Sequence, residues 1–441
     1  MAKKTKAANL SIEEKLEQAL IVPGYEPYKI PDNWCWTNLK TVCNLDNGIK
    51  HNNESLVYFD AKTLREITEP VSRNSGVIVE KGQKVILVDG ENSGEVFVIP
   101  DRGYMGSTFR ILNISKQFDE MYIRYFIDIF REELKKNKIG SAIPHLNKEL
   151  FYGLQFPLPP LPEQQRIVER IESLFSKLDE AKEKAQEVIN SFETRKAAIL
   201  HKAFSGELTA KWREENGVGI ESWESTKIGN MLTEIKYGTS EKSDYSFDGI
   251  PVFRIPNIGD MTLIFDDVKK IQRQECSENE YLSENDILII RSNGSKELVG
   301  KCALVPKINF KCTYASFLIR LRMKDSISSL YTVWYLTSEQ ARKQLFNKAK
   351  SSAGIHNINS KEISDISIVV PSKPEQNIIT ATLERLITKE KETVIFAESV
   401  IDQIDAMKKA ILARAFRGEL GTNDPKEESA VELLKQILSG E

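Results

Sequence analysis

The chain has 441 residues, enough for two or three ordinary domains, and its 41% hydrophobic and 28% charged residues are typical of a globular protein. Its basic first residues are not followed by the apolar segment of a signal peptide, and no run of about 18 apolar residues predicts a membrane-spanning helix, so we expect a cytoplasmic protein without a membrane partner. The net charge of −3 excludes the strong basic excess typical of a protein that holds DNA alone through phosphate contacts, so a tight grip on DNA would need cations from a partner.

The dominant feature of the chain is an internal repeat. The segment PPLPEQ at 159–164 recurs as PSKPEQ at 371–376, and KAAILHKAFSGEL at 196–208 recurs as KKAILARAFRGEL at 408–420. Both pairs are separated by 212 residues, so no insertion or deletion lies between the repeated ends. Such a constant length is expected of a helix with a fixed packing register, because one extra residue would rotate its apolar face by about 100°.

Apolar residues between these repeated ends follow an alternating four-and-three spacing, which predicts a coiled-coil seam. The first seam comprises Ile167, Ile171, Leu174, Leu178, Ala181, Ala185, Val188, Phe192, Arg195 and Ile199, and the second comprises Ile379, Leu383, Leu386, Glu390, Thr393, Ala397, Val400, Ile404, Met407 and Ile411. Arg195 is the only polar member of the first, whereas Glu390 and Thr393 interrupt the second. A generic coiled-coil spacer would explain the heptads but not the repeated PEQ and GEL ends.

Two residue types mark the limits of the predicted helices. Pro162 and Pro374 stand near the expected starts, where a proline costs little, and Gly206 and Gly418 stand where a left-handed C-terminal cap is expected. The chain therefore divides in order into an N-terminal extension with a short helix (1–27), a first globular domain (28–158), a first long helix (159–213), a second globular domain (214–370), a second long helix (371–420) and a tail (421–441) with a short amphipathic helix predicted over Ala430–Leu438.

The two globular domains resemble each other faintly. Trp34, Thr37 and Leu39 match Trp223, Thr226 and Ile228; Val85–Val88 matches Ile287–Ile290 as a buried strand; Gly106–Arg110 resembles Ala315–Arg320; and Ser141–Asn147 resembles Ser352–Asn359. The sequences diverge strongly between these anchors. Two domains with matching anchor segments but different polar loops suggest that they perform the same task on different targets.

Connectivity predicts how the helices run. The second domain joins the end of the first helix to the start of the second, so two helices whose seams meet must be antiparallel. Roughly 40 residues at about 1.5 Å each give a pair about 60 Å long. We therefore expect one domain at each end, a pseudo-twofold axis across the pair, and the two termini close together beside the first domain.

The repeated segments, PLPPLPEQQRIVERIESLFSKLDEAKEKA with RKAAILHKAFSGELT and later PEQ with KKAILARAFRGEL, resemble the conserved regions of the specificity (S, HsdS-type) subunit of type I restriction–modification enzymes. DNWCWTNLKTV, GIPVFRIPNI and DILIIRSNGSKELVGKCALV are similar to segments of that family's target recognition domains. The resemblance extends from about Tyr28 to Leu420. It implies an α+β fold in which two target recognition domains are separated by a long antiparallel coiled-coil helix pair, with a pseudo-twofold internal repeat.

The same resemblance implies a function. Each recognition domain would read one half of a bipartite, asymmetric sequence in double-stranded DNA, and the helices would hold the two halves at a fixed separation. It further implies docking of two methyltransferase (M) subunits and, through them, of restriction/translocase (R) subunits, so that one reader directs both methylation and restriction. The near-neutral charge fits this interpretation, because the methyltransferases would help to hold the duplex.

Motifs for catalysis by the chain itself are missing. The only PP dipeptide, Pro159-Pro160, is not preceded by the Asn or Asp of an adenine methyltransferase loop, and Gly294 to Cys302 fails the spacing and the hydroxyl of a phosphate-binding loop. The pattern Pro31-Asp32 with Asp60-Ala61-Lys62 resembles a nuclease signature but is too short to be specific. The five cysteines, Cys35, Cys43, Cys276, Cys302 and Cys312, contain no CxxC pair. We expect a non-catalytic subunit without a metal or a cofactor.

Residues for base reading are predicted in polar loops at strand ends, where side chains capable of bidentate base contacts gather. In the first domain these are Arg73, Asn74, Asn92, Ser93, Thr108, His145 and Asn147; in the second they are Arg254, Asn257, Arg291, Asn293, Ser295, Lys296, His356 and Asn357. A turn or capping role is the alternative for each, since Asn and Ser favour turns on backbone grounds. Arg254 and Asn293 are the strongest candidates because they follow strand-like runs.

The helix ends predict a partner surface. Phe204 and Leu208, with Phe416 and Leu420 in the second copy, would present exposed apolar side chains beside a glycine. The alternative is a local cap in which the leucine folds back on its helix. Two other functions compete with the specificity subunit: a stand-alone DNA-binding coiled-coil regulator, which the neutral charge disfavours, and a fused nuclease–specificity chain, which the missing motifs disfavour.

Overall fold

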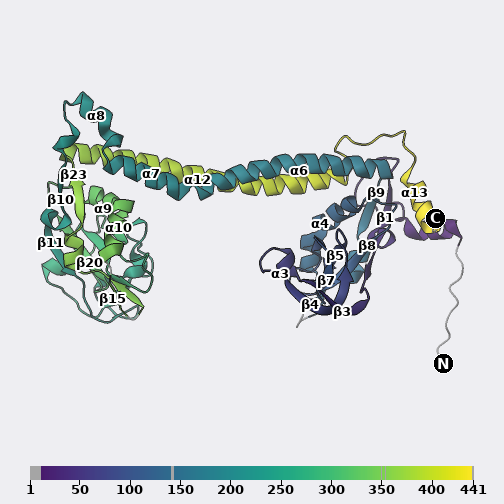
Figure 1. Ribbon diagram of the computed structural model, residues 1–441, viewed down its shortest axis with the longest axis horizontal. Helices are drawn as coiled ribbons and strands as arrows, with labels where there is room; N and C mark the ends of the chain where they lie inside the picture. The colour runs from purple at the N-terminus through teal and green to yellow at the C-terminus, as the bar shows by residue number, and fades with distance from the viewer. Residues whose placement is uncertain (1–10, 141–143, 349, 353, 440–441) are drawn as a thin grey trace. The chain divides into compact units, whose positions relative to one another are not determined.

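The computed structural model describes residues 11–140, 144–348, 350–352 and 354–439 and divides into two compact units (Figure 1). Unit 1 comprises Met1–Ala185 and Ser399–Glu441, and unit 2 comprises Gln186–Glu398. Part of the predicted N-terminal extension (1–10) and three residues of the repeat predicted at Ser141–Asn147 (141–143) lie outside the described residues, as does Ala353. No helix among the described residues is both long and apolar enough to cross a membrane.

Unit 1 joins the first globular domain to the chain's last residues. Its helices are α1 (Ile12–Ala19), α2 (Leu39–Val42), α3 (Ala61–Leu64), α4 (Glu120–Lys136), α5 (Lys148–Gly153) and α13 (Ala430–Ser439), with most of α6 (Leu161–Asn190) and the end of α12 (Lys373–Ala415). Its strands are β1 (Cys35–Asn38), β2 (Cys43–Asp46), β3 (Lys50–Phe59), β4 (Val71–Val79), β5 (Lys84–Leu87), β6 (Val96–Val98), β7 (Gly103–Met105), β8 (Phe109–Ile114) and β9 (Gln155–Leu158). They form a β1–β9 pair, a β2-β8-β5-β6 sheet and a closed β3-β4-β7 group.

Unit 2 contains the second domain and the rest of both long helices. Its helical elements are the end of α6, α7 (Phe192–Phe204), η1 (Glu207–Thr209), α8 (Ala210–Glu215), η2 (Ile220–Ser222), η3 (Ile228–Met231), η4 (Ile255–Asn257), η5 (Glu278–Glu280), α9 (Ser329–Thr337), α10 (Glu339–Lys348), α11 (Ser360–Ser364) and the start of α12. Its strands are β10 (Glu224–Lys227), β11 (Leu232–Tyr237), β12 (Ser243–Asp244), β13 (Pro251–Phe253), β14 (Met261–Thr262), β15 (Lys269–Ile271), β16 (Ile287–Ile290), β17 (Ser292–Asn293), β18 (Cys302–Leu304), β19 (Thr313–Tyr314), β20 (Leu318–Met323), β21 (Lys350–Ser352), β22 (Ile355–Asn357) and β23 (Ser367–Val370). A β10–β23 pair accompanies the sheets β11-β20-β16-β18-β14, β12-β15-β13-β19 and β17-β22-β21.

Both domains open with the same strand pair. In unit 1, β1 runs antiparallel to β9 with Cys35 opposite Leu158; in unit 2, β10 runs antiparallel to β23 with Glu224 opposite Val370. The amides of Leu39 and Ile228 then bond to the carbonyls of the residues just before β9 and β23. The predicted match of Trp34, Thr37 and Leu39 with Trp223, Thr226 and Ile228 is therefore confirmed.

The predicted match of the central strands is wrong by one residue. The amide of Gly94 donates to Leu87 and that of Gly300 donates to Ile290, and both glycines have positive φ. Leu87 is thus equivalent to Ile290, and Lys84–Leu87 rather than Val85–Val88 corresponds to Ile287–Ile290. Val85–Leu87 and Ile287–Ile290 are all buried and apolar, and Val88 continues the apolar run beyond β5, so apolar character alone does not fix the register.

The long helices run antiparallel within each unit. In unit 1 (Figure 1, teal α6 beside the yellow end of α12), Lys182 pairs with Asp405 at 2.8 Å while Asp179 pairs with Lys408. In unit 2, Arg195 on α7 donates to Glu390 on α12 at 2.6 Å. Two of the three polar residues predicted inside the seams, Arg195 and Glu390, therefore face each other and form an ion pair.

The seams are buried only in part. Ile167, Ile171, Ala185, Ile379, Leu383, Ala397 and Ile404 are buried, whereas Ala181, Thr393 and Met407 are exposed. The first helix is also not continuous, since α6 ends at Asn190 and α7 begins at Phe192. Ser191 separates them; its hydroxyl donates to the carbonyl of Glu187 at 2.6 Å, a side-chain bond that bends helices. Backbone bonds still run through it, from Ser191 to Glu187 and from Arg195 to Ser191.

A buried carboxylate explains the repeated Glu of the PEQ segments. Glu375, at the start of α12, is fully buried and accepts hydrogen bonds from Thr209 at 2.6 Å, Arg213 at 2.7 Å and Trp223 at 3.0 Å. All three donors follow the end of α7. The start of one long helix is thereby bonded to the segment that leaves the other.

Unit 1 repeats this arrangement. Glu163, near the start of α6, is also fully buried and accepts from Thr422, just beyond α12, at 2.7 Å and from Arg166 at 2.7 Å. Arg166 in turn donates to Glu427 in the tail, and these bonds raise the pKa of the guanidinium above its ordinary value. The cation comes from a different place in the chain, but the Glu–Thr bond between helix start and helix end is the same.

The glutamine of each PEQ segment bonds a globular domain to the start of its long helix. The side-chain oxygen of Gln164 accepts from the amide of Asp119, the N-cap of α4, at 2.9 Å. That of Gln376 accepts from the amide of Ser328, the N-cap of α9, at 2.7 Å. Both amide groups are fully buried, so each helix start is a structural joint rather than a surface motif.

The glycines of the GEL segments have the predicted left-handed conformation. Gly206 has φ +85° and Gly418 has φ +72°. A Cβ atom would also collide with Ile220 at the first position and with Pro31 at the second. Two independent constraints, backbone conformation and close packing, therefore require glycine there.

The prediction that Phe204 and Phe416 form an exposed partner surface is wrong. Phe204 is 4% exposed and packs edge-on against Tyr331 and Tyr335, and Phe416 is 1% exposed and packs against Tyr122 and Phe126. Each helix end thus completes the core of a globular domain. Leu208 and Leu420 are half-buried against the same two cores.

The predicted tail helix exists as α13, and it belongs to unit 1. Ala430 and Leu434 are fully buried, the amide of Ala430 donates to the carbonyl of Asn33, and Lys15 on α1 donates to Leu438. This places α1 beside α13, as expected for termini that lie close together.

We expect Phe416→Ala to lower the stability of unit 1 by about 3–5 kcal/mol, because it leaves a cavity among the rings of α4. Phe396→Ala is the matched control, since Phe396 lies on the same helix but is 68% exposed, and it should change stability by less than about 0.5 kcal/mol. Urea unfolding followed by circular dichroism measures both. Equal midpoints for the two variants would contradict the buried position of Phe416.

Candidate nucleic-acid interface

Polar residues of unit 1 gather where β5 ends. The amide of Leu146 donates to the carbonyl of Val88, and the amide of Val88 donates to that of Thr108, so three separate loops meet here. His145 lies in this group, exposed, with its Nδ1 2.7 Å from the carboxylate of Asp89. The carboxylate orients the imidazole while its other nitrogen stays open to solvent, as a base-edge contact requires.

Arg73 and Asn74 lie on β4 and are exposed. The guanidinium of Arg73 stacks on the ring of Tyr58, 3.4 Å from the ring centroid. The hydroxyl of Tyr58 would be 3.2 Å from a Cβ placed on Gly106, two residues before Thr108. Arg73 is therefore held on a platform that adjoins the loop of Thr108.

Two of the other predicted residues of this domain, Ser93 and Asn147, have structural positions, whereas Asn92 contributes only its backbone carbonyl to the fold. Ser93 is fully buried, so its prediction as a base contact is wrong; the tight turn after β5 places its hydroxyl inside the domain. Asn147 caps α5 by accepting from the amide of Leu150 at 3.1 Å, which is the capping alternative considered for it. The carbonyl of Asn92 accepts from the amide of Glu95 in the same turn, and its side chain is half-buried.

In unit 2 the candidates lie on a small antiparallel ribbon. Strand β17 pairs with β22, with Asn293 opposite His356 and Ser292 opposite Asn357. All four side chains are partly exposed. The structure thus brings together two predicted segments that are more than 60 residues apart in sequence.

The two histidines are not equivalent. Ile358 donates its amide to Arg291, just as Leu146 donates to Val88, so His145 corresponds to Asn357. The second predicted segment, 352–359, has one residue more than the first, 141–147, and this extra residue shifts the register. A different polar side chain therefore lies at the equivalent position of each domain.

Arg291 lies between these strands and the rest of the domain. Its guanidinium stacks on Tyr237, 4.7 Å from the ring centroid, and its Nε is shielded from solvent and has no hydrogen-bond partner among the described residues. The hydroxyl of Tyr237 accepts from the amide of Ser360 at 3.0 Å, which fixes the ring. Beside this group, Ser295 donates to Glu297 and Lys296 lies over Phe346.

Arg254 and Asn257 lie in another loop. Asn257 is fully buried; it accepts from the amide of Arg254 at 2.8 Å and donates to the carbonyls of Ile264 and Asp266. Its prediction as a base contact is wrong, because its hydrogen-bonding groups are used to fold η4 and the loop after it. Arg254 donates to the carbonyl and the carboxylate of Asp267, so it is engaged within the domain.

The structure adds aromatic residues that the sequence interpretation missed. Tyr58 and Tyr237 are the platforms for two arginines, and Phe317, at the position equivalent to Thr108, is 56% exposed. Aromatic residues next to glycine-rich turns, as in Tyr237-Gly238, are the sequence signal that could have identified the second platform.

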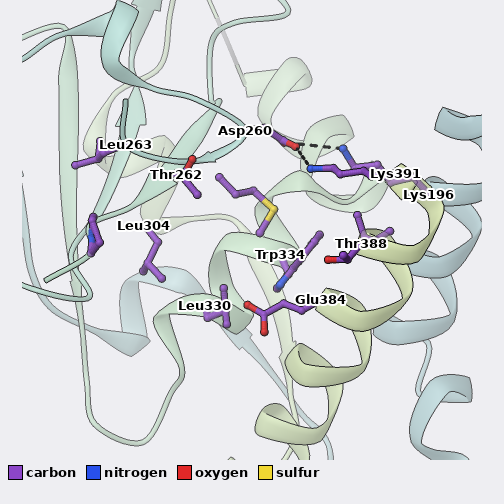
Figure 2. Close-up of a pocket in the computed structure, with 13 residues that line it drawn as sticks. Lys196, Asp260, Thr262, Leu263, Leu304, Leu330, Trp334, Glu384, Thr388 and Lys391 are labelled. Atoms are coloured by element: carbon purple, nitrogen blue, oxygen red, sulfur yellow. Dashed lines mark hydrogen bonds and ion pairs between the residues drawn. The ribbon is translucent and has the colours of Figure 1, made fainter. Parts of the chain in front are cut away.

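A cavity of about 330 Å³ lies elsewhere in unit 2, between the second domain and its helices (Figure 2). Trp334, Leu304 and Leu330 form its apolar wall, and Asp260 closes one side by bonding Lys391 at 2.8 Å with Lys196 at 4.0 Å. Burial raises the pKa of Asp260, but the bond from Lys391 and the charge of Lys196 lower it further, to a net value below the ordinary one.

The equivalent place in unit 1 contains two aromatic rings. The hydroxyls of Tyr122 and Tyr331 bond to the equivalent carbonyls of Pro157 and Val369, which aligns Tyr125 with Trp334. There Tyr125 packs edge-on against Phe175, 5.8 Å between centroids. Ile387 occupies the position of Phe175 in the repeat, so the cavity reflects a smaller side chain on α12.

Reactive centres are not evident in the described residues. The five cysteines are free, and burial raises the pKa of Cys35, Cys43, Cys302 and Cys312 to about 12. No three His, Cys, Asp or Glu side chains within the described ranges form a group that could hold a metal ion. What the described surface offers is hydrogen-bonding and stacking groups.

Comparison with known families gives a match over most of the chain. The type I restriction modification DNA specificity domain matches residues 31–191 and again 220–395. This chain belongs to that family. It is accordingly a specificity subunit, the DNA-recognising and non-catalytic component, and the two matches coincide with the two halves of the internal repeat.

Curated relatives agree along nearly the full length. The EcoKI specificity subunit of Escherichia coli (strain K12) is 26% identical over 89% of this chain and 90% of its own, and the StySPI specificity subunit of Salmonella potsdam is 25% identical over the same shares.

Two solved structures share the fold. A chain from a structure of the assembly and conformational transition of the type I restriction–modification system has a TM-score of 0.68 at 20% identity and covers 89% of this chain and 100% of its own. The HsdS subunit from Thermoanaerobacter tengcongensis has a TM-score of 0.58 at 20% identity, covering 89% and 99%. The predicted α+β fold, with two recognition domains and a long antiparallel helix pair, is confirmed.

We expect Asn257→Ala to destabilise unit 2 by about 1–3 kcal/mol, because it leaves buried backbone groups without partners. Asn74→Ala is the matched control, since Asn74 is exposed on a strand. Thermal unfolding measures both. A midpoint for Asn257→Ala equal to that of the control would show that the buried bonds of Asn257 are dispensable.

Proposed function

We propose that this specificity subunit reads a bipartite, asymmetric DNA sequence, with one recognition domain for each half-site. The observation that carries the proposal is that the two domains share a strand framework but differ in the side chains at equivalent positions beside the ends of β5 and β16. His145 stands where Asn357 stands in the other domain, and Thr108 corresponds to Phe317. Equivalent positions with different hydrogen-bonding groups would select different bases.

The proposed base-reading residues follow from the geometry of each domain. In the first domain they are Arg73, Asn74, Asn92, Thr108 and His145; in the second they are Arg291, Asn293, Ser295, Lys296, His356 and Asn357. Arg254 is better placed for a phosphate or a structural role, because Asp267 already accepts from its guanidinium. The domain limits 28–158 and 214–370, with helical regions 159–213 and 371–420, are part of the same proposal.

We further propose assembly with two methyltransferase subunits and, through them, with restriction/translocase subunits, in the cytoplasm. Specificity subunits of this family assemble with other subunits and bind DNA. The net charge of −3 supports a shared grip on the duplex, because counterion release from phosphates requires cations that this chain does not have in excess. A stand-alone DNA-binding regulator is the competing function, and it would bind a specific duplex without any partner.

Reconstitution separates these two functions. The chain is mixed with its methyltransferase subunit, and binding to a library of duplexes is selected and sequenced. We expect a bipartite motif from the complex and little selection from the chain alone. Equal selection by the chain alone would support the regulator instead.

The helix pair is proposed to set the spacing between the half-sites. Facing heptads can be removed together, because Asp179 and Lys182 pair with Lys408 and Asp405. Deleting 177–183 together with 404–410 removes both ion pairs, keeps the seam in register and shortens each helix by about 10 Å. We expect the methylated motif to keep both half-sites and to have a shorter spacer; altered half-sites in methylome sequencing would contradict a spacing role.

The part of the predicted partner surface that fits the structure is Leu208 with Leu420, which are partly exposed. We expect Leu208→Ser with Leu420→Ser to reduce co-purification of the methyltransferase subunit several-fold without unfolding the chain. Met407→Ser, which alters an exposed apolar residue of α12, is the control. Undiminished co-purification of the double variant would remove these leucines from the interface.

A further inference from the structure

Each recognition domain contains one arginine that differs from all its neighbours. Residues 28–158 contain six arginines, and residues 214–370 contain another six. Ten of the twelve have a protein acceptor within the described residues, a carboxylate or a carbonyl, namely Arg65, Arg102, Arg110, Arg124, Arg131, Arg254, Arg273, Arg320, Arg322 and Arg342. Arg73 and Arg291 have no such acceptor among the residues that the structure describes.

These two arginines share a second property. The guanidinium carbon of Arg73 lies 3.4 Å from the ring centroid of Tyr58, and that of Arg291 lies 4.7 Å from the ring centroid of Tyr237. Stacking restricts a side chain that would otherwise be highly flexible, and it leaves the N–H edge of the guanidinium free to donate.

The platforms adjoin equivalent turns. The hydroxyl of Tyr58 lies beside Gly106, as its 3.2 Å distance from a Cβ built there shows. Gly238, the residue after Tyr237, packs against the carbonyl of Ala315. Gly106 and Ala315 are equivalent, because their carbonyls accept from the amides of Phe109 and Leu318 at the start of β8 and β20.

The arginines themselves come from unrelated places in the frame. Arg73 lies on β4, whereas Arg291 follows β16 at the position of Val88. Its backbone is fixed on both sides by bonds to Phe317 and Ile358, and its Nε is shielded from solvent without an acceptor. An arginine that stacks on a tyrosine and has no protein acceptor within the described ranges therefore occurs in each domain, at different positions of the shared strand framework.

The missing acceptor indicates the ligand. A planar guanidinium that is held by stacking matches the paired acceptors O6 and N7 on the major-groove edge of guanine, which is the commonest specific arginine contact with DNA. A phosphate contact would not require the restricted orientation that stacking gives to both arginines, nor the shielding of the Nε of Arg291 from solvent. Resting on the proposed bipartite recognition, we propose that Arg73 and Arg291 each read a guanine, so that each half-site contains a G·C pair at the position each arginine contacts.

The test uses the complex of the full chain with its methyltransferase subunit and the duplex that it selects. Guanines are replaced one at a time by 7-deazaguanine, which lacks the N7 acceptor. We expect one sensitive guanine in each half-site, with binding weakened about ten- to a hundred-fold. Arg73→Ala should abolish the sensitivity in one half-site only, and Arg291→Ala should abolish it in the other only.

Matched controls are available in both domains. Arg102 and Arg273 are partly exposed arginines paired with glutamates, and Arg102→Ala and Arg273→Ala should leave the sensitive guanines unchanged. Arg73→Lys and Arg291→Lys keep the charge but lose the fork, so they should relax the base preference while retaining most of the affinity for random DNA. These lysine variants keep the test valid if an alanine variant fails to fold.

A half-site without a G·C pair would overturn the proposal, as would a selected duplex that is insensitive to 7-deazaguanine at every position. So would an equal loss of affinity for all sequences in the arginine variants, because that is the result expected of phosphate contacts. A complex that selects no bipartite motif at all would instead contradict the underlying function, and the unmodified duplex library distinguishes that case.

Discussion

The hydrogen bond between a buried glutamate at the start of one long helix and a threonine just beyond the end of the other is the interaction on which the rest of the molecule depends. Glu163 with Thr422 and Glu375 with Thr209 make this contact in the two units. A carboxylate without solvent is stable only when its oxygens are fully bonded, so the chain must bring its donors to the same place. That requirement fixes which end of each helix meets which.

The neighbouring residues extend this joint into the recognition domains. Gln164 and Gln376 hold the N-caps of α4 and α9, and Phe416 and Phe204 enter the cores beside those helices. The residues proposed to read bases lie in other segments, around Val88 and Arg291, the residues that follow β5 and β16. The strand framework can therefore stay constant while these side chains differ, as His145 and Asn357 show at equivalent positions of the two domains.

The sequence predicts the helices, their limits and their antiparallel course, because these depend on periodicity, on proline and glycine, and on connectivity. Arg195 and Glu390, two apparent faults in the seams, turn out to be each other's partners. Predictions failed where burial decides. Phe204 and Asn257 have residue types that suit a surface or a loop, and only the three-dimensional packing shows that a core and a folded turn enclose them. Arg73 and Arg291 were predicted as base contacts, but the tyrosines on which they stack were not. A sequence alone does not show which groups surround a side chain in the folded chain.

The membership of α13 and of the end of α12 in unit 1 has a consequence for the order of synthesis. The core around Tyr122 includes Phe416 and Leu434. Both are synthesised some 290 residues or more after Tyr122. Unit 2, by contrast, is a single continuous stretch, Gln186–Glu398. Since domains fold as units during translation, the second half of the chain can be complete first. The first domain is synthesised earliest, but its core is completed only when the end of α12 and α13 have been synthesised.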